Sequence, residues 1–582
     1  MEVLSSKSHD HIVYVLTKGP MQPQGAGLSP AQLDAVAAYL VALGNTDSGS
    51  PKPAEPSLHA NLCKGRTLPF RPGASAWNGW SPDLENTRMQ SLPGLRISDI
   101  PRLKPKWVFA YPGGSVYGPP SVVGGRVFLG TRAGDVFSLD AATGCTYWAT
   151  EFGSPIKTAI LVGDWSPSRR INGFKTRYVA YFGGSDAFVH AVDAETGITL
   201  WSSKVDTHPF AAVGESPKLY QGKLYVPIRS GESAVGDREH YSCCTLRGGF
   251  VVLSAITGNL LSRAYTITEE PKPFKLNRAG TQMYGPAGGS IWSPLTIDVR
   301  TGAIYGASAE SRTDAPSGGT DALIAFDLST GIQRWAMQAT ANDNYTWFCD
   351  REPRGANCPE VYGPDADFAS PPVLRTLAGG KRVLIAAQKS GMVHAVDPDA
   401  QGKVVWRRNL AEDAHIPLGV VLHDREQPGV VFGMAADESK LYVAIADPST
   451  QPGHVPLGLY ALKLLDGELI WHTPGATVPA CSWGSKGCTG AQRTAVTLIP
   501  EVAFAGSANG HMRAYSTRDG SILWDFDTAR TYAAVNGVQA QGGSIEGAAA
   551  VVADHTLFVM SGYASYGGGT GNALIAFTVD GR

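Results

Sequence analysis

A short unit of strand, turn and strand, ending in a tryptophan, recurs along the 582-residue chain and constrains its fold more than any other feature. In the copy at residues 321–335, the side chains of residues 323–328 alternate with the two-residue period of a β-strand. Asp327 to Gly331 then read as a tight turn, because aspartate can bond its own backbone two residues on and glycine takes positive φ at little steric cost. A second short strand carries Trp335. The unit is therefore a β-hairpin with a large aromatic anchor.

The repeat occurs eight times, and its tryptophans are about 50–70 residues apart, which is room for four strands and their loops. A four-stranded sheet repeated around an axis is a propeller blade, and closure of the ring leaves only short, protected edges. We therefore predict an all-β, eight-bladed β-propeller, closed by pairing of residues 104–111 with residues 572–579. The tryptophans expected to pack in the seams between blades are Trp148, Trp201, Trp335, Trp406, Trp471 and Trp524.

Charge and hydropathy argue against two kinds of partner. The formal net charge is −2 and no basic cluster stands out, so nothing supports a nucleic-acid partner. No apolar run approaches the ~20 residues that a membrane-spanning helix needs. Eight cysteines, several in close pairs, favour an oxidising compartment. Met1 to Asp10, in contrast, carry no signal-peptide pattern.

The N-terminal region does not resemble the repeats. Residues 28–44 read as one helix, with Ser29 as the N-cap, Pro30 in the first turn and Gly44 at the C′ position. A Gly-Pro-Met loop precedes this helix and carries Met21.

This loop and helix resemble the last third of a small c-type cytochrome, in which that methionine ligates haem. The haem-attachment motif Cys-x-x-Cys-His is absent from the sequence. We therefore expect residues 1–45 to be a truncated or degenerate cytochrome c-like segment without covalent haem; a plain terminal helix is the alternative. Residues 46–66 are rich in Ser, Gly, Pro and charge and are interpreted as a linker, and residues 67–582 as the propeller.

The third and fourth units carry residues that the repeat does not require. Cys243 and Cys244 are adjacent, and adjacent cysteines that bridge each other form a rigid eight-membered ring; two unrelated thiols are the alternative. Trp292 follows a Gly-Pro-Ala-Gly-Gly-Ser-Ile run away from the blade-tail position, where core packing is the alternative. With the tail pattern Ala-x-Asp-x-x-Thr-Gly-x-x-x-Trp, these segments resemble the quinoprotein alcohol dehydrogenases, eight-bladed propellers that hold pyrroloquinoline quinone and Ca²⁺ on their axis. The resemblance implies that the disulfide ring packs on one face of the quinone and Trp292 stacks on the other.

The same resemblance implies roles for further residues. Lys389 lies where the family has Arg or Lys at the reactive carbonyls of the quinone, and a cation there stabilises the negative charge of reduction. Asp343 lies eight residues after Trp335, where the family places its catalytic aspartate, a general base for hydride transfer to the quinone. The expected calcium ligands are Glu232, Glu310 in place of the family's asparagine, and Asp343. For Glu232, Asp343 and Lys389 an ordinary side chain in a loop or turn is the alternative.

Two further features narrow the resemblance. Tyr345 stands where the lanthanide-dependent branch has an aspartate, which favours calcium. Residues 481–492 and the glycine-rich residues 537–547 resemble the polyvinyl alcohol dehydrogenase branch, in which a cytochrome segment precedes the propeller. The sequence leaves the disulfide connectivity open. The possible pairs are Cys349 with Cys358, Cys481 with Cys488, and Cys63 with Cys145.

The resemblance implies a quinone-dependent oxidoreductase of secondary alcohols, with polyvinyl alcohol as the expected substrate. It also implies a separate cytochrome c-type electron acceptor and a periplasmic or secreted location. The alternatives are a quinoprotein for another small alcohol or sugar and a non-enzymatic scaffold propeller. The family order of Cys243, Cys244, Trp292, Asp343 and Lys389 argues against a scaffold. The sequence contains no glycine-rich nucleotide loop that would support a nicotinamide enzyme.

Overall fold

The structure is a computed structural model that describes residues 12–13, 17, 28–46, 58, 60–64, 70–113, 118–236, 238–346, 349, 353–411, 429–446, 457–475, 481, 483–484, 488–563 and 568–582. Met21 lies outside the described residues. None of the helices in the described part of the chain is both long and apolar enough to cross a membrane.

Helix α4 (Pro30–Thr46) begins as predicted. Ser29 Oγ accepts a hydrogen bond of 3.3 Å from the Gln32 amide, and Gln32 Oε1 accepts one of 2.8 Å from the Ser29 amide, which is a reciprocal N-terminal cap. The predicted end at Gly44 is wrong, because the helix continues to Thr46. A glycine inside a last turn costs only about 1 kcal/mol, so it does not by itself end a helix.

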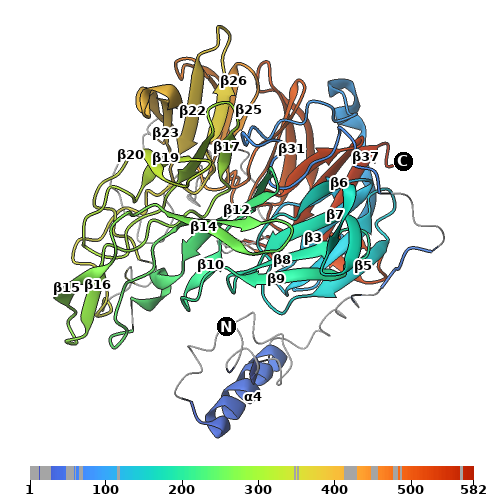
Figure 1. Cartoon of the computed structure of the whole chain (residues 1–582). Helices are drawn as coiled ribbons and strands as arrows, with labels where there is room; N and C mark the ends of the chain where they lie inside the picture. The colour runs from blue at the N-terminus through green and yellow to red at the C-terminus, as the bar shows by residue number, and fades with distance from the viewer. Residues whose placement is uncertain are drawn as a thin grey trace.

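Eight antiparallel sheets make up the propeller, as predicted (Figure 1). Blade 1 consists of β2 (Ser121–Val123), β3 (Arg126–Gly130), β4 (Asp135–Asp140) and β5 (Thr146–Glu151), and blade 2 of β6 (Leu161–Ile171), β7 (Phe174–Gly183), β8 (Phe188–Asp193) and β9 (Thr199–Lys204). Blade 3 has five strands, β10 (Ala211–Val213), β11 (Lys218–Tyr220), β12 (Lys223–Ser230), β13 (Gly249–Ser254) and β14 (Leu260–Tyr265). Blade 4 consists of β17 (Thr296–Asp298), β18 (Ala303–Ala307), β19 (Ala322–Asp327) and β20 (Gln333–Gln338). Blade 5 consists of β21 (Val373–Thr376), β22 (Arg382–Ala387), β23 (Met392–Asp397) and β24 (Lys403–Asn409), and blade 6 of β25 (Ala435–Ala436), β26 (Lys440–Ile445), β27 (Gly458–Lys463) and β28 (Leu469–Thr473). Blade 7 consists of β29 (Thr497–Ile499), β30 (Val502–Gly506), β31 (His511–Ser516) and β32 (Ile522–Asp527). Blade 8 combines the two ends of the chain, with β35 (Ala550–Ala553), β36 (Thr556–Ser561), β37 (Ala573–Val579) and β1 (Leu103–Ala110). Outside the blades lie the hairpins β15 (Lys272–Leu276) with β16 (Gln282–Gly285) and β33 (Thr531–Ala533) with β34 (Gln539–Gln541), and the 3₁₀ turns η1 (Ile97–Arg102), η2 (Glu232–Val235) and η3 (Pro398–Ala400).

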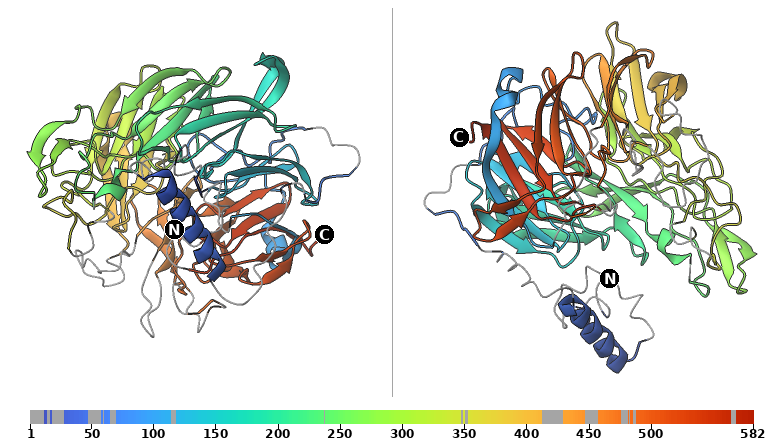
Figure 2. Two further views of the ribbon diagram at one scale, coloured as in Figure 1. Left: turned by 90° about the horizontal axis from the view of Figure 1, so that it is seen from below. Right: turned by 180° about the vertical axis from the view of Figure 1, so that it is seen from behind.

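The ring closes where β1 pairs with β37, from Leu103 opposite Val579 to Ala110 opposite Ala573. The Tyr111 amide extends the pairing with a 3.0 Å bond to the Asn572 carbonyl. The predicted closure is therefore confirmed. In both views of Figure 2 the early, blue and cyan strands lie beside the late, red ones.

The repeated hairpin joins each blade to the next. In the copy of blade 4, Asp327 Oδ1 accepts bonds from the Ser329 and Thr330 amides at 3.0 and 2.9 Å, as its predicted turn requires. The tryptophan rings then pack against the turn glycine of the following blade; a methyl group on Gly402, for example, would come within 2.7 Å of the Trp335 ring. The indole N–H groups of the other tail tryptophans and of Trp107 donate to backbone carbonyls across the seam. These bonds run from Trp148 to Ala194, Trp201 to Ala255, Trp406 to Leu464, Trp471 to Thr517, Trp524 to Leu103 and Trp107 to Ala141.

A segment that the repeat pattern does not predict crosses the axis. Residues 77–90, here named the plug, bond to the innermost strands of all eight blades. The bonds join Trp77 to Val122, Asn78 to Val162, Asp83 to Lys218, Leu84 to Ile297, Glu85 to Leu374, Thr87 to Ala436, Arg88 to Leu498 and Arg88 to Ala550. The plug therefore ties every blade to one short segment at the centre of the ring.

All eight cysteines form disulfides, and the possible pairings from the sequence are confirmed. The pairs are Cys63–Cys145, Cys243–Cys244, Cys349–Cys358 and Cys481–Cys488.

Candidate functional site

The predicted site residues lie on loops of blades 3 to 5. Some come before the innermost strands β17 and β21, and the others lie between the second and third strands of their blades, namely between β12 and β13, β18 and β19, and β22 and β23. Trp292 comes four residues before β17, and Lys389 lies in the turn between β22 and β23. The plug pairs with β17 and β21 themselves, so the site and the plug occupy successive levels along the axis.

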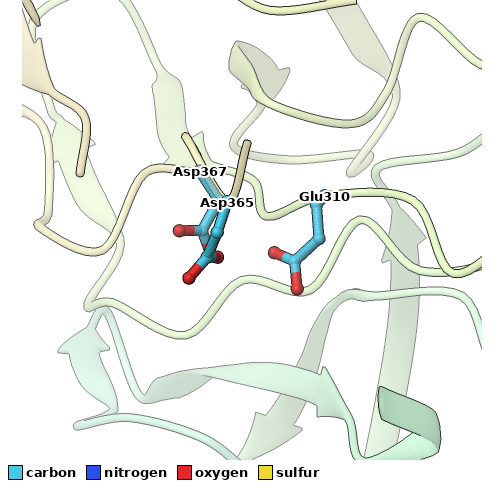
Figure 3. A group of neighbouring side chains, drawn as sticks. All are labelled: Glu310, Asp365 and Asp367. Atoms are coloured by element: carbon cyan, nitrogen blue, oxygen red, sulfur yellow. The ribbon is translucent and has the colours of Figure 1, made fainter. Parts of the chain in front are cut away.

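Three acidic side chains converge at this level. One carboxylate oxygen from each of Glu310, Asp365 and Asp367 lies within 4.8 Å of the other two, a spacing that can hold a metal ion. Figure 3 shows the carboxylates of Asp365 and Asp367 side by side and that of Glu310 turned toward them. Glu232 and Asp343, the other two predicted ligands, lie outside this group of three.

Asp367 joins this acidic group to Trp292 and Lys389, two of the four residues predicted to contact the quinone. Trp292 Nε1 donates to Asp367 Oδ2 at 2.8 Å, and Lys389 Nζ lies 2.9 Å from Asp367 Oδ1 and 2.8 Å from Asp365 Oδ1. The Lys389 ammonium also lies 4.8 Å from the centre of the Trp292 ring. Trp292, Lys389 and Asp367 thus form one connected unit.

Glu310 is buried and forms an ion pair with Arg312 through Oε1. Burial alone raises the pKa of Glu310, but Arg312 and Lys389 outweigh it and lower the pKa to about 2. Its second oxygen, Oε2, is buried and has no hydrogen-bond partner among the described residues. The carboxylate is therefore ionised and has one oxygen left to bind a cation.

Asp343 is also buried, but its carboxylate is occupied by backbone amides. Oδ2 accepts a 2.6 Å bond from Ala366, and Oδ1 accepts longer ones from Tyr345 and Asp365 at 3.2 and 3.3 Å. Burial and the nearby Glu310 raise the pKa of Asp343 to about 6, although the backbone bonds oppose the rise. These bonds hold the Asp343 carboxylate against the backbone that carries Asp365 and Asp367.

Negative charge exceeds positive charge around this group. Asp321 is fully buried, neither of its carboxylate oxygens has a hydrogen-bond partner among the described residues, and burial and then Asp343 raise its pKa well above the ordinary range. Burial raises the pKa of Asp365 to about 7 and that of Asp367 well above the ordinary range, although Lys389 opposes both shifts. The acidic side chains are Glu310, Asp321, Asp343, Asp365 and Asp367, and the basic ones beside them are Arg312 and Lys389. Buried carboxylates in such excess require protons or a metal cation.

Glu232 holds the loop of the Cys243–Cys244 disulfide. Its Oε1 accepts bonds from the Tyr241 hydroxyl at 2.8 Å and the Thr245 amide at 3.0 Å, and its Oε2 accepts a 2.8 Å bond from the Leu246 amide. The disulfide itself is buried. Glu232 is thus placed to orient the disulfide through its own loop.

A second charged group lies on blades 1 to 3. Arg132 occupies the β3–β4 turn of blade 1, the position that Lys389 has in blade 5, four blades away in a ring of eight. Burial, helped by Arg229 and Arg132, lowers the pKa of Lys157 to about 7, and burial raises the pKa of the neighbouring Glu215 to about 8. Three basic side chains therefore face one acidic side chain here, the reverse of the balance at blades 4 and 5.

Asp365 and Asp367 were missed by reasoning from the sequence, although a signal existed. The run Asp365-Ala-Asp-Phe368 stands just before β21, at the site level, like Trp292 before β17. Counting residues from Trp335 reaches Asp343 first, because a long connection with the Cys349–Cys358 disulfide separates the two acidic segments. The bond from Ala366 to Asp343 brings the segments together only in the folded chain.

Comparisons with known proteins agree with this arrangement. A protein-family model described as "Outer membrane protein assembly factor BamB" matches residues 79–272 and 320–572. The chain is 40% identical over 583 residues to a polyvinylalcohol dehydrogenase of Pseudomonas sp, covering 97% of this chain and 88% of that protein. It is 37% identical over 608 residues to a polyvinylalcohol dehydrogenase of Sphingopyxis sp. (strain 113P3), covering 100% and 89%. The crystal structure of quinohemoprotein alcohol dehydrogenase from Comamonas testosteroni has a similar fold, with a TM-score of 0.60 and 18% identity over 87% of this chain and 81% of that one.

Proposed function

Because the chain belongs to the polyvinylalcohol dehydrogenase family, we propose that it oxidises secondary alcohols, including the hydroxyl groups of polyvinyl alcohol, to ketones. The observation that carries the proposal is the contact of Asp367 with both Trp292 and Lys389. This contact supports a site in which a proton acceptor, a flat aromatic ring and a cation meet at one place.

The described residues fit pyrroloquinoline quinone. Trp292 offers an aromatic face and the buried Cys243–Cys244 ring a second flat surface, which suits a planar cofactor. Arg132, Lys157 and Arg229, on blades 1 to 3, suit the carboxylates of the quinone, and Lys389 suits its reactive carbonyls. When bound, the quinone supplies the hydride acceptor; the chain supplies orientation, exclusion of water and a proton acceptor.

The acidic group fits a divalent cation, which we propose to be calcium. Glu310 brings an ionised carboxylate with a free oxygen, and Asp365 and Asp367 bring two more, all hard oxygen donors. The ligand set inferred from the sequence, with Glu232, Glu310 and Asp343, stays a prediction. The convergence of one oxygen each from Glu310, Asp365 and Asp367 favours Asp365 and Asp367 over Glu232 and Asp343, which lie outside this group.

For the general base, the contacts favour Asp367 over Asp343. A base must lie within hydrogen-bond reach of the proton that it removes, beside the hydride acceptor. Asp367 contacts Trp292 and Lys389 directly, whereas Asp343 accepts its hydrogen bonds from the backbone amides of residues 345, 365 and 366. We therefore propose that Asp367, ionised when the cation is bound to the acidic group, takes the hydroxyl proton and that Asp343 fixes its loop.

Reconstitution tests the function. Purified protein should gain dehydrogenase activity toward 2-hexanol and polyvinyl alcohol after addition of pyrroloquinoline quinone and Ca²⁺, with a quinone absorption band that stays with the protein on gel filtration. Glucose and ethanol as parallel substrates distinguish the alternative of another small alcohol or sugar. Quinone that does not stay bound, with no activity on any alcohol, would favour the scaffold alternative.

Electrons from the reduced quinone need a further carrier. We propose a separate cytochrome c-type acceptor and a periplasmic or secreted location, which four disulfides support. The lack of Cys-x-x-Cys-His predicts no covalent haem, and a haem stain on a denaturing gel tests this.

A further inference from the structure

A pocket of about 360 Å³ lies beside the Cys243–Cys244 disulfide, and its lining includes none of the five acidic residues of the site. Thr245 and Leu246, which directly follow the disulfide, form one wall. Tyr284 forms another, and its backbone is bonded to both cysteines, at 3.1 Å to the Cys244 amide and 2.8 Å to the Cys243 carbonyl. The pocket and the proposed quinone clamp therefore share a wall.

The charges in this pocket are neutralised by the protein itself. Arg263 Nη1 lies 2.5 Å from Asp206 Oδ2. Arg247 Nη1 donates to the carbonyls of Ile267, Thr268 and Glu269 at 3.1–3.3 Å, and its Nη2 lies 3.9 Å from Glu270. Two arginines thus face two carboxylates, with their guanidinium groups already engaged. Such a pocket gives little attraction to an ionic ligand and suits an uncharged one.

The remaining surface alternates flat apolar groups with hydroxyl-binding groups. The Arg247 guanidinium lies 3.8 Å from the centre of the Tyr265 ring, which fixes both as one flat platform. Leu246 is buried beneath the pocket, and the Thr245 hydroxyl lies 3.2 Å from His208 Nε2. Glu270 is 84% exposed at the rim, so its carboxylate can accept bonds from a ligand. The pocket thus combines the aromatic and apolar surfaces of Leu246, Tyr265, Pro271 and Tyr284 with several polar groups, which suits a neutral organic ligand that carries hydroxyls.

We propose that this pocket is a subsite for the polymer chain next to the unit that is oxidised. A chain of alternating CH₂ and CHOH groups matches its flat surfaces and its hydroxyl-binding rim. The wall shared with the disulfide places flanking units beside the clamp while one carbinol lies at the quinone. This inference rests on the proposed function and adds a specificity site to it: binding of flanking units raises kcat/KM for the polymer but not for a short alcohol.

The test compares polyvinyl alcohol with 2-hexanol in the reconstituted holoenzyme. Tyr265→Ala removes the platform and Glu270→Ala removes a rim acceptor. Glu269→Ala is the matched control, because Glu269 is exposed and adjacent but only its backbone carbonyl serves the pocket. We expect Tyr265→Ala to raise KM for the polymer about tenfold and Glu270→Ala about threefold, with kcat/KM for 2-hexanol within about twofold of wild type. Tyr265→Phe, which keeps the ring, should restore the polymer KM.

Several outcomes separate this proposal from the proposed function. An unchanged polymer KM in Tyr265→Ala and Glu270→Ala overturns the subsite, and so does an equal loss on both substrates that Tyr265→Phe does not restore. If the protein oxidises no alcohol, calorimetric measurement of polyvinyl alcohol binding still tests whether the pocket is a polymer subsite. Polymer binding that Tyr265→Ala abolishes and Glu269→Ala retains supports the subsite, and binding that neither variant changes overturns it.

Discussion

The plug and the acidic group lie at neighbouring levels of one axis, but they differ in how far the protein itself satisfies their buried charges. Arg88 of the plug is fully buried between Trp77 and Trp80, 5.0 and 4.6 Å from their rings, and donates four hydrogen bonds. Its acceptors are the carbonyls of Trp80, Val496 and Ala550 and the Thr497 hydroxyl. At and around the acidic group, in contrast, five carboxylates lie beside two basic side chains, and neither oxygen of Asp321 has a hydrogen-bond partner among the described residues.

This difference separates a structural role from a functional one. Buried polar groups that only support a fold are normally satisfied by the protein, as Arg88 is. Buried titratable groups that the protein leaves unsatisfied are typical of sites that bind or react with something else. The comparison therefore predicts that changes in the plug alter stability, whereas changes in the acidic group alter catalysis and metal binding.

The largest effect is expected from Asp367→Asn, which keeps the shape and removes the proton acceptor. General-base assistance is worth roughly 10²–10⁴-fold, or about 3–5 kcal/mol of barrier. We expect this loss in kcat on 2-hexanol, measured at equal quinone occupancy by absorbance. Asp343→Asn is the matched control and should lose far less. The reverse order, with Asp343→Asn the slower variant, would restore the assignment made from the sequence.

Arg88→Ala should mainly affect folding. The substitution leaves the buried carbonyls of Trp80 and Val496 without their donor, whereas that of Ala550 keeps the Thr497 hydroxyl. Each unsatisfied group costs about 1–3 kcal/mol, so we expect the free energy of unfolding to fall by at least about 2 kcal/mol. Urea unfolding measures this fall. Arg88→Lys keeps the charge but loses the planar fork, and should recover only part of it. A loss below about 1 kcal/mol would show that the plug does not hold the blades together.

The sequence predicts the features that carry a local pattern and misses those that depend on contacts between distant residues. The repeat carries local signals in every copy: strand alternation, the turn at Asp327 to Gly331, and the tail tryptophan. Eight blades and their closure at β1 and β37 could therefore be derived from the amino-acid sequence alone. The plug carries no such period, because residues 77–90 bond to strands up to about 460 positions away.

The site was predictable only where a family motif had a distinctive local form. Cys243–Cys244 is an adjacent pair, and Trp292 stands outside the tail position, so both could be singled out. Asp367 could not be distinguished from Asp343 by counting, because the distance to Lys389 and Trp292 is set by the fold and not by spacing along the chain.

Calcium should stabilise the protein through the acidic group and not through the plug. A ligand that binds only the native state adds about 2.7 kcal/mol at a concentration one hundred times its Kd. We expect thermal unfolding of chelator-treated protein to shift upward with Ca²⁺, and Glu310→Gln to reduce the shift. Arg88→Lys should keep the full calcium increment, since separate sites contribute additively. An equal shift in Glu310→Gln and wild type would exclude Glu310 as a ligand.

The smallest expected effect is a pH dependence from Asp343 in chelator-treated protein. Burial raises the pKa of Asp343 from an ordinary value near 3.8 to about 6, so the native state prefers the protonated form. Its contribution to stability is full below pH ~3.8, is lost as pH rises to about 6, and is absent above that value. Asp343→Asn does not titrate, and its amide meets the Ala366 N–H with a pH-independent penalty. Wild type should therefore lose on the order of 2–3 kcal/mol relative to the variant between pH 4 and 7 in urea unfolding. Parallel pH profiles for the two proteins would mean that the bonds from Ala366, Tyr345 and Asp365 fully compensate the burial of this carboxylate, as the bonds of Arg88 do in the plug.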